Sequence, residues 1–236
     1  MLKIRSKFNY LLTEGVVIET EEVLEAIDMV NSKLDELGNQ TEALALNIFK
    51  VIDFRMLSGM VGEMLVDQLS KANPNLEKNP NIDGYPDLVN VSTSRYLEDF
   101  QEWKNSDLSK FIKYPYGGLE IKNTFGTKKS GTSLLNSERR ISKVNRKPDW
   151  KAHHGYTNNL LALFSDFDKG IPKIVSALYA DDLNEDDWTI KQNPAQDSTM
   201  TSFCVIKRSG WDKIRKNVLI CETDVDYENY FDIKDI

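Results

Sequence analysis

The first third of the chain carries apolar side chains at helical spacing. Between residues 21 and 37 they stand three and four positions apart, as on a helix with one buried face. They are Val23, Leu24, Ile27, Val30, Leu34 and Leu37. Thr20 before this stretch and Gly38 after it are typical of a helix start and a helix stop. The same spacing predicts a second helix from about residue 41 to 52 and a third over residues 58–71, and we expect all three to pack on a sheet.

The middle of the chain has short apolar runs bounded by turn residues, which predict β-strands. Residues 88–91 form one such run, and residues 117–124 form another. Between them, over residues 95–116, aromatic and leucine side chains fit one or two short helices inserted between the strands. We interpret these aromatic side chains as packing groups rather than base-stacking groups.

Further apolar runs extend the sheet toward the C-terminus. Residues 160–164 and 171–179 flank the turn Asp168-Lys169-Gly170, so they predict a hairpin. Residues 203–207 and 218–222 predict two more strands. Helices followed by strands indicate an α/β (α+β) protein with a central mixed sheet flanked by helices.

Length and composition indicate one globular unit. The 236 residues suit a single domain over residues 1–236, with a helical N-terminal part of about residues 1–72 and a core of about residues 73–222. Turn residues are frequent over 73–86, which predicts loops rather than a linker between domains. Hydrophobic residues make up 40% of the chain and charged residues 28%, which is typical of globular proteins.

The chain shows no sign of export or membrane insertion. No apolar run approaches the roughly 20 residues that a membrane span needs. The N-terminus lacks the apolar segment of a signal peptide. The two cysteines, Cys204 and Cys221, stand in separate apolar runs, which favours buried reduced thiols over a metal site. We therefore expect a cytoplasmic protein with no membrane partner.

Charge is distributed unevenly along the chain. The net charge is −7, which argues against a simple electrostatic binder of nucleic acid. Residues 122–151, however, hold nine Lys or Arg and two acids, a local charge of +7 that leaves −14 for the rest. This window could be a solvated helix face, as charge runs usually are, or a surface that contacts phosphates. The acidic residues after 222 are expected to be peripheral.

The basic window begins at a group of residues suited to binding a metal. On a strand, Glu120 and Lys122 point to the same face, while Leu119 and Ile121 point to the core. Asp87 stands at the start of the earlier strand. If the two strands are neighbours, Asp87 and Glu120 can share a divalent cation, and carboxylate oxygens suit Mg²⁺.

Pro86-Asp87 and Glu120-Ile121-Lys122 together resemble the motif of the PD-(D/E)XK nuclease superfamily, above all the type II restriction endonucleases. The resemblance implies a restriction-endonuclease-like core and Mg²⁺-dependent hydrolysis of phosphodiester bonds in double-stranded DNA. It implies that Asp87 and Glu120 bind the metal together with the backbone carbonyl of Ile121. Lys122 would position the attacking water and offset charge. Palindromic targets would favour a homodimer.

Many members of the superfamily that the motif resembles carry a glutamate on the helix before the aspartate strand. Glu63 occupies that place in the third predicted helix, beside Gly62. The resemblance makes Glu63 an additional metal ligand, whereas the alternative is an exposed helix glutamate. Both interpretations remain open on the sequence alone.

The segment after Lys122 is the candidate DNA-binding surface. Small polar residues, glycines and lysines follow the strand, and a predicted helix over residues 133–147 carries several basic side chains. The candidate DNA contacts are Asn123, Thr124, Lys128, Lys129, Arg139, Arg140, Lys143, Arg146 and Lys147.

Three other interpretations compete with a site-specific nuclease. The motif residues could form an ordinary surface ion pair beside a turn. The chain could be a repair or recombination nuclease of the same fold that recognises DNA structure, or a DNA-binding protein without catalysis. His153 and His154 precede Asn158-Asn159, but no flanking motif supports a histidine-based nuclease. Intact Asp87, Glu120 and Lys122 favour an enzyme.

Overall fold

The computed structural model describes residues 1–6, 10–125, 151–152, 155, 157–191 and 203–233. A sheet of seven strands runs through this part of the chain. In spatial order the strands are β1 (Leu2–Ile4), β12 (Val218–Glu222), β9 (Ile171–Ala180), β8 (Leu160–Asp168), β6 (Gly118–Thr124), β5 (Leu88–Asn90) and β4 (Leu76–Lys78). Strands β6 and β8 pair in parallel and all other neighbours pair antiparallel, so the predicted mixed sheet is confirmed.

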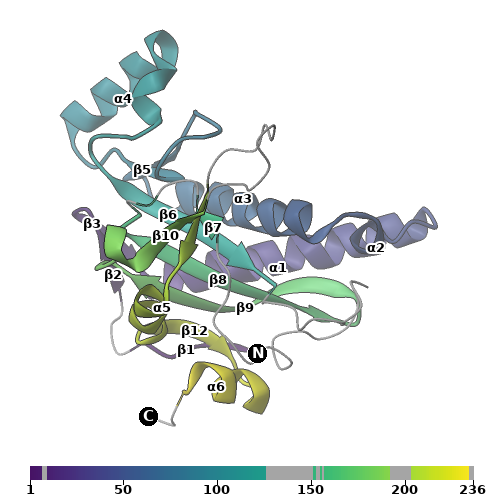
Figure 1. Cartoon of the computed structure of the whole chain (residues 1–236). Helices are drawn as coiled ribbons and strands as arrows, with labels where there is room; N and C mark the ends of the chain where they lie inside the picture. Colours follow the sequence, from purple (N-terminus) through teal and green to yellow (C-terminus); the bar gives the residue numbers. More distant parts are fainter. Residues whose placement is uncertain (7–9, 126–150, 153–154, 156, 192–202, 234–236) are drawn as a thin grey trace.

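Helices α1 (Thr20–Ala43), α2 (Ile48–Val51) and α3 (Phe54–Ala72) form the layer on one face of the sheet (Figure 1). Their apolar side chains share one core with Leu119, Ile121 and other sheet residues. Burial of this apolar surface is the main force that fixes the helices on the sheet. The prediction that N-terminal helices pack on the sheet is therefore confirmed.

The ends of the first helix differ from the prediction. Glu19, not Thr20, is the N-cap, and it forms a capping box with Glu22. Gly38 does not end the helix, which continues to Ala43. A β-carbon at Gly38 would lie 3.2 Å from the Phe49 ring, so this glycine allows α2 to pack closely against α1. The predicted helix over residues 41–52 is reduced to the short α2, because residues 41–43 belong to α1.

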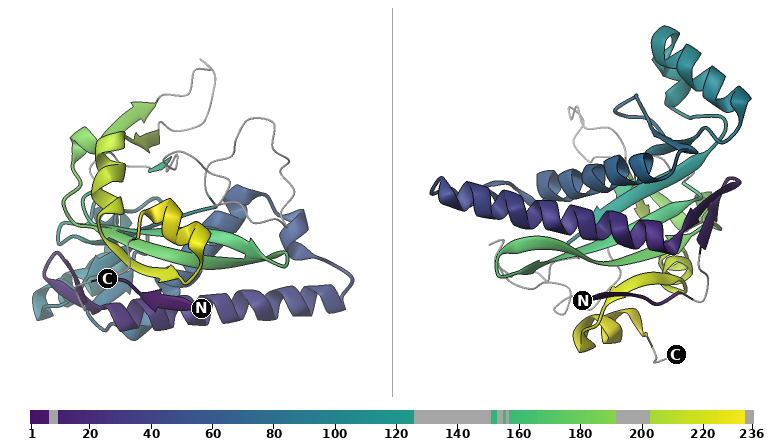
Figure 2. Two further views of the ribbon diagram at one scale, coloured as in Figure 1. Left: turned by 90° about the horizontal axis from the view of Figure 1, so that it is seen from below. Right: turned by 180° about the vertical axis from the view of Figure 1, so that it is seen from behind.

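The second face of the sheet is covered by C-terminal elements, as the two views of Figure 2 show. They are β7 (Lys151–Ala152), η3 (Glu185–Asp187), β10 (Trp188–Lys191), β11 (Phe203–Ile206), α5 (Arg208–Arg215) and α6 (Val225–Phe231). The predicted strands over 203–207 and 218–222 are confirmed, and Cys204 and Cys221 are buried thiols that no disulfide joins. The expectation of a peripheral C-terminus is wrong for α6, because Tyr227 and Phe231 are buried in this second core.

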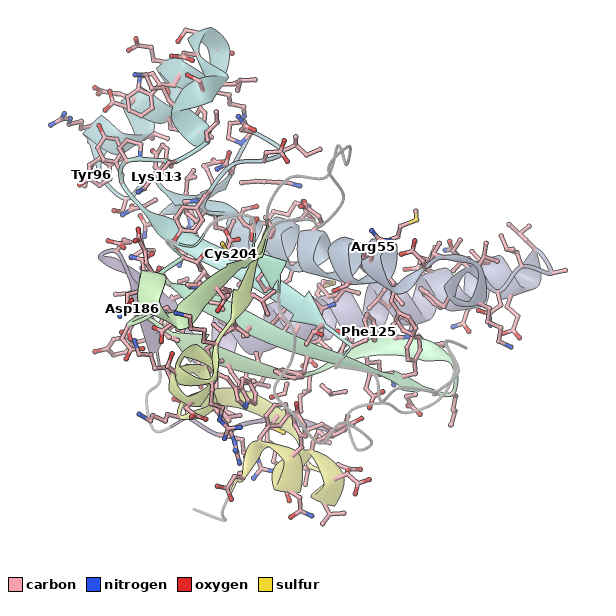
Figure 3. All side chains as sticks on the ribbon, viewed as in Figure 1. Arg55, Tyr96, Lys113, Phe125, Asp186 and Cys204 are labelled. Atoms are coloured by element: carbon pink, nitrogen blue, oxygen red, sulfur yellow. The ribbon has the colours of Figure 1, made fainter. Side chains whose placement is uncertain are left out.

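Helix α4 (Ser94–Ser106) and the turn η1 (Leu108–Phe111) form an arm, residues 92–116, that extends from the sheet between β5 and β6 (Figure 1). The predicted insertion is thus confirmed. Its aromatic side chains pack on one another: the Tyr96 and Tyr116 rings stack 4.0 Å apart, and Phe111 stacks on Tyr114. Tyr96 lies on this arm, whereas Phe125 lies beyond the opposite end of β6 (Figure 3).

Three N-terminal strands were not predicted. Strand β1 is an edge strand of the central sheet, and β2 (Tyr10–Thr13) forms a hairpin with β3 (Val16–Glu19). All three are only three or four residues long, so their alternation is too brief to be recognised in the sequence. No helix in the described ranges is long and apolar enough to cross a membrane.

Candidate active site

The pairing of β5 with β6 brings Asp87 next to Glu120. Leu88 pairs with Leu119 and Val89 with Gly118, so the next step of the antiparallel register places Asp87 opposite Glu120. Gly118 permits this close pairing. Its φ is +149°, and a β-carbon there would lie 1.9 Å from the carbonyl oxygen of Leu88.

Next to the backbone hydrogen bonds between β5 and β6, the Asp87 side chain makes one more hydrogen bond between the two strands. One carboxylate oxygen, Oδ2, accepts a hydrogen bond of 2.8 Å from the backbone N–H of Ile121. The N–H and C=O of a strand residue point to the same edge, so the Ile121 carbonyl also lies on the Asp87 side. The carboxylate of Asp87 and the carbonyl of Ile121 therefore share one edge of β6.

Glu120 and Lys122 lie together on one face of β6, as predicted. Glu120 is 3% exposed, and its Oε1 lies 2.7 Å from the Lys122 Nζ. Among the described residues, no group donates a hydrogen bond to the other oxygen, Oε2. Leu119 and Ile121 face the opposite core with α1 and α3, which confirms the predicted alternation. A buried carboxylate oxygen without a partner is costly and requires an explanation.

The charges of these three residues strongly perturb one another. Burial and the Glu120 carboxylate raise the pKa of Asp87 to about 7, although Lys122 and the Ile121 N–H act in the opposite direction. Burial would lower the pKa of Lys122, but the carboxylates of Glu120 and Asp87 outweigh it and raise that pKa above its ordinary value. Two adjacent carboxylates with one ammonium group leave a net negative site, which favours a bound cation.

The oxygen atoms at this site fit a hard divalent cation. Asp87, the free Oε2 of Glu120 and the carbonyl of Ile121 are all oxygen donors of the kind that Mg²⁺ prefers. A cation there would satisfy the buried Oε2 and separate the two carboxylates. In the part of the chain that the structure describes, no three His, Cys, Asp or Glu side chains gather as a metal-binding group. Asp87, Glu120 and the carbonyl of Ile121 are the ligands that this geometry offers to a cation.

Glu63 lies outside this group of oxygens. It stands on α3, its side chain is 60% exposed, and it forms an ion pair with Lys78 of β4. It is close enough to raise the pKa of Asp87, as the smallest of the contributions. Its predicted role as a metal ligand stays a prediction.

Two of the predicted DNA contacts lie within the described residues. The Asn123 side chain is used inside the protein, because its Oδ1 accepts from the Ser165 hydroxyl at 2.8 Å and its amide faces the Ser58 carbonyl. Thr124 is half-buried at the end of β6. The other predicted contacts, Lys128, Lys129, Arg139, Arg140, Lys143, Arg146 and Lys147, lie outside the described residues, as do His153 and His154.

A network of polar side chains next to the site was not predicted. The carboxylate of Glu14, in the turn of the β2–β3 hairpin, accepts hydrogen bonds from Asn158 and Asn159 at the start of β8. The hydroxyl of Tyr85, two residues before Asp87, donates to Asn158. The Asn-Asn pair before an apolar strand was a visible signal, but its partners are remote in sequence.

We compared the chain with protein-family models, curated proteins and solved structures, and none of these comparisons found a match. The residues of this chain and their geometry therefore carry the functional proposal.

Proposed function

We propose that this protein is a Mg²⁺-dependent endodeoxyribonuclease that hydrolyses phosphodiester bonds in double-stranded DNA. The observation that carries the proposal is the buried Oε2 of Glu120, to which no group in the described part of the chain donates a hydrogen bond, beside the carboxylate of Asp87. In a purely structural ion pair, a buried carboxylate oxygen is expected to have a hydrogen-bond donor. A metal site instead keeps an oxygen ready for a cation.

Each residue of the site has a distinct part in this reaction. The carboxylates of Asp87 and Glu120 and the carbonyl of Ile121 would hold Mg²⁺. When bound, Mg²⁺ supplies charge neutralisation and Lewis-acid polarisation of the phosphoryl group. Because the Ile121 N–H bonds to Oδ2 of Asp87, that carboxylate has a fixed orientation relative to β6. Preorganisation of this kind costs no rearrangement during the reaction.

Lys122 is suited to stabilising negative charge on the phosphate. Its raised pKa keeps the side chain protonated at neutral pH, and the bond to Glu120 Oε1 fixes its Nζ beside the carboxylates. An ammonium group in that position can orient the attacking water and stabilise the charge that develops in the transition state.

Double-stranded DNA as the substrate is supported by the motif and by the charge that follows it. Pro86-Asp87 and Glu120-Ile121-Lys122 resemble the PD-(D/E)XK motif, and the basic residues 122–151 begin at Lys122 itself. The mixed sheet and a helix before the aspartate strand agree with a restriction-endonuclease-like core. We therefore propose cleavage at a specific site by a homodimer, as in type II restriction endonucleases.

Incubation of the purified protein with plasmid DNA tests this proposal. We expect discrete fragments with Mg²⁺ and none with EDTA, and loss of cleavage in Asp87→Asn. Asp168→Asn is the matched control, because Asp168 is an acid of the same sheet that pairs with Lys173 at the far end of β8. A smear would contradict site specificity alone, whereas intact DNA under all metal conditions would contradict the nuclease proposal.

A further inference from the structure

The turn of the β2–β3 hairpin docks where β6 and β8 begin. Oε1 of Glu14 accepts two hydrogen bonds, from the side-chain amides of Asn158 at 2.8 Å and Asn159 at 2.9 Å. The backbone carbonyl of Glu14 accepts a third, from the Asn90 amide at 2.9 Å. The neighbouring Thr13 hydroxyl donates to the Gly118 carbonyl at 2.7 Å. This one turn thus contacts the end of β5 and the starts of β6 and β8.

From Glu14, the contacts continue to both acidic residues of the candidate site. The carbonyl of Asn159 accepts the backbone N–H of Glu120 at 3.1 Å, so Asn159 sets the position of that residue relative to β8. Oδ1 of Asn158 accepts the Tyr85 hydroxyl at 2.7 Å, and Tyr85 precedes Asp87 by two residues. Asn158 thus contacts the side chain of Tyr85, close to Asp87, and the backbone of Asn159 contacts that of Glu120.

The backbone of Glu14 is unusual for its residue type. Glu14 and Gly15, the two central residues of the turn, have φ of +47° and +84°. Positive φ at both positions is typical of a type I′ hairpin turn, where Asn, Asp or Gly is preferred. A left-handed conformation costs a residue like glutamate about 1–2 kcal/mol. An unfavourable residue kept at a turn is a reason to look for a function of its side chain.

We propose that Glu14 is a positioning residue whose carboxylate, through Asn158 and Asn159, fixes the spacing of Asp87 and Glu120. Metal use depends on this spacing, so the inference rests on the proposed nuclease function. Glu14 itself touches neither acid. Its hydrogen-bonded contact with the two asparagines holds the start of β8 beside β6 and the Tyr85 segment beside both strands.

Two substitutions at Glu14 separate this role from turn stability. Asn suits the left-handed turn position but is one methylene shorter, so Glu14→Asn should keep the thermal midpoint while losing the contacts to both amides. We expect it to raise the Mg²⁺ concentration for half-maximal cleavage on the order of tenfold, since small misplacements of reacting groups are costly. Glu14→Gln keeps an acceptor oxygen at the same reach, so its Mg²⁺ requirement should stay within about threefold of the wild-type value.

Amide hydrogen exchange provides a readout without metal or substrate. The N–H of Glu120 bonds to Asn159, and that of Ile121 bonds to Asp87. In Glu14→Asn we expect both amides to exchange about tenfold faster, as local opening becomes easier. Asn31→Ala is the matched control, because the Asn31 side chain also makes two hydrogen bonds, both to the backbone of Ile174 in β9. It should accelerate Ile174 exchange and leave the Mg²⁺ requirement unchanged.

Unchanged exchange of Glu120 and Ile121 in Glu14→Asn would overturn the inference. So would an Asn31→Ala variant with an equally raised Mg²⁺ requirement, or a Glu14→Gln variant that behaves like Glu14→Asn. If the wild-type protein cleaves no DNA, the nuclease proposal fails, and the exchange rates still decide whether Glu14 positions the two acids.

Discussion

Two buried acid–lysine pairs in this protein differ in what surrounds the acid. On β6, Glu120 is 3% exposed, and Lys122 lies 2.7 Å from one of its oxygens. On the opposite side of the sheet from α1, Asp187 is 2% exposed and Lys213 of α5 lies 2.7 Å away. Distance and burial are nearly the same, so neither separates a functional pair from a structural one.

The difference lies in the remaining hydrogen bonds. Asp187 also accepts from the backbone N–H of Asn184, and Ser209 donates to it as well. Burial alone would raise the pKa of Asp187, but these donors and Lys213 outweigh it and hold that pKa below its ordinary value. Glu120 instead keeps one oxygen without a donor among the described residues, and its charge helps raise the pKa of Asp87.

When the acid of each pair is mutated, the largest expected difference is in the rate of catalysis. Glu120→Gln should lower the rate of Mg²⁺-dependent plasmid cleavage on the order of 10³-fold, because a charged ligand is lost from the reacting centre. Asp187→Asn, assayed well below its thermal midpoint, should stay within about threefold of wild type. If both variants lose activity equally, the two pairs do not differ in function.

A smaller catalytic loss is expected from the lysine. Lys122→Met keeps the length of the side chain and removes its charge, so the cleavage rate at saturating Mg²⁺ should fall about 100-fold. Lys213→Met serves as the control and should cleave normally. A Lys122→Met enzyme that regains full activity at higher Mg²⁺ would indicate that Lys122 only assists metal binding.

The loss of folding stability should be larger for the Asp187 mutation than for the Glu120 mutation, the reverse of the order for catalysis. Asp187→Asn should reduce the free energy of unfolding by about 2 kcal/mol in urea titrations at pH 7, because Lys213 loses its charged partner in a partly buried place. Glu120→Gln should cost less than about 1 kcal/mol, since Asp87 remains close to Lys122 and the repulsion between carboxylates is relieved. An equal loss would mean that Glu120 is a structural acid as well.

The last effect concerns pH in the absence of metal. The folded pKa of Asp87, about 7, lies above the ordinary 3.8, so stability from its protonated form is complete below about pH 4 and is lost as pH rises through 7. Asp87→Asn mimics the protonated form. In EDTA it should therefore gain at least about 1 kcal/mol relative to wild type between pH 4 and pH 8.

Asp187 provides the opposite case. Its pKa is lowered, so the stability it contributes is present above its ordinary pKa and disappears as pH falls into the acidic range. Urea titrations of both variants measure the two slopes, across pH 4 to 8 for Asp87→Asn and below about pH 4 for Asp187→Asn. A flat difference for Asp87→Asn would show that this carboxyl titrates normally.

The sequence predicted what depends on local patterns. Alternation along residues 117–124 correctly placed Glu120 and Lys122 opposite Leu119 and Ile121, and the turn at Asp168-Lys169-Gly170 correctly joined two strands. The sequence leaves the pairing of the Asp87 and Glu120 strands open, because register is decided by contacts between distant segments.

Other features depend on tertiary contacts that a single sequence does not display. Gly38 looked like a helix stop, but its missing side chain makes room for Phe49. Glu14 carries no pattern in the sequence, and only the folded chain joins it to Asn158 and Asn159 across more than 140 residues. Hydrogen bonds between remote polar groups follow no periodicity, so pattern analysis cannot find them.

The arm between β5 and β6 makes this protein modular. The chain leaves the sheet after Asn90 and returns at Gly118, and β5 and β6 pair directly beneath it. Phe100, Phe111 and Tyr114 give the arm a small core with Val89 and Val91. Phe111 and Tyr114 also hydrogen-bond to the backbone of Tyr85, which ties the base of the arm to the Asp87 segment. Helix α4 lies outside these backbone contacts, so its length could change during evolution without moving the paired strands. The sequence spacing between the two halves of the motif would then vary with the length of α4.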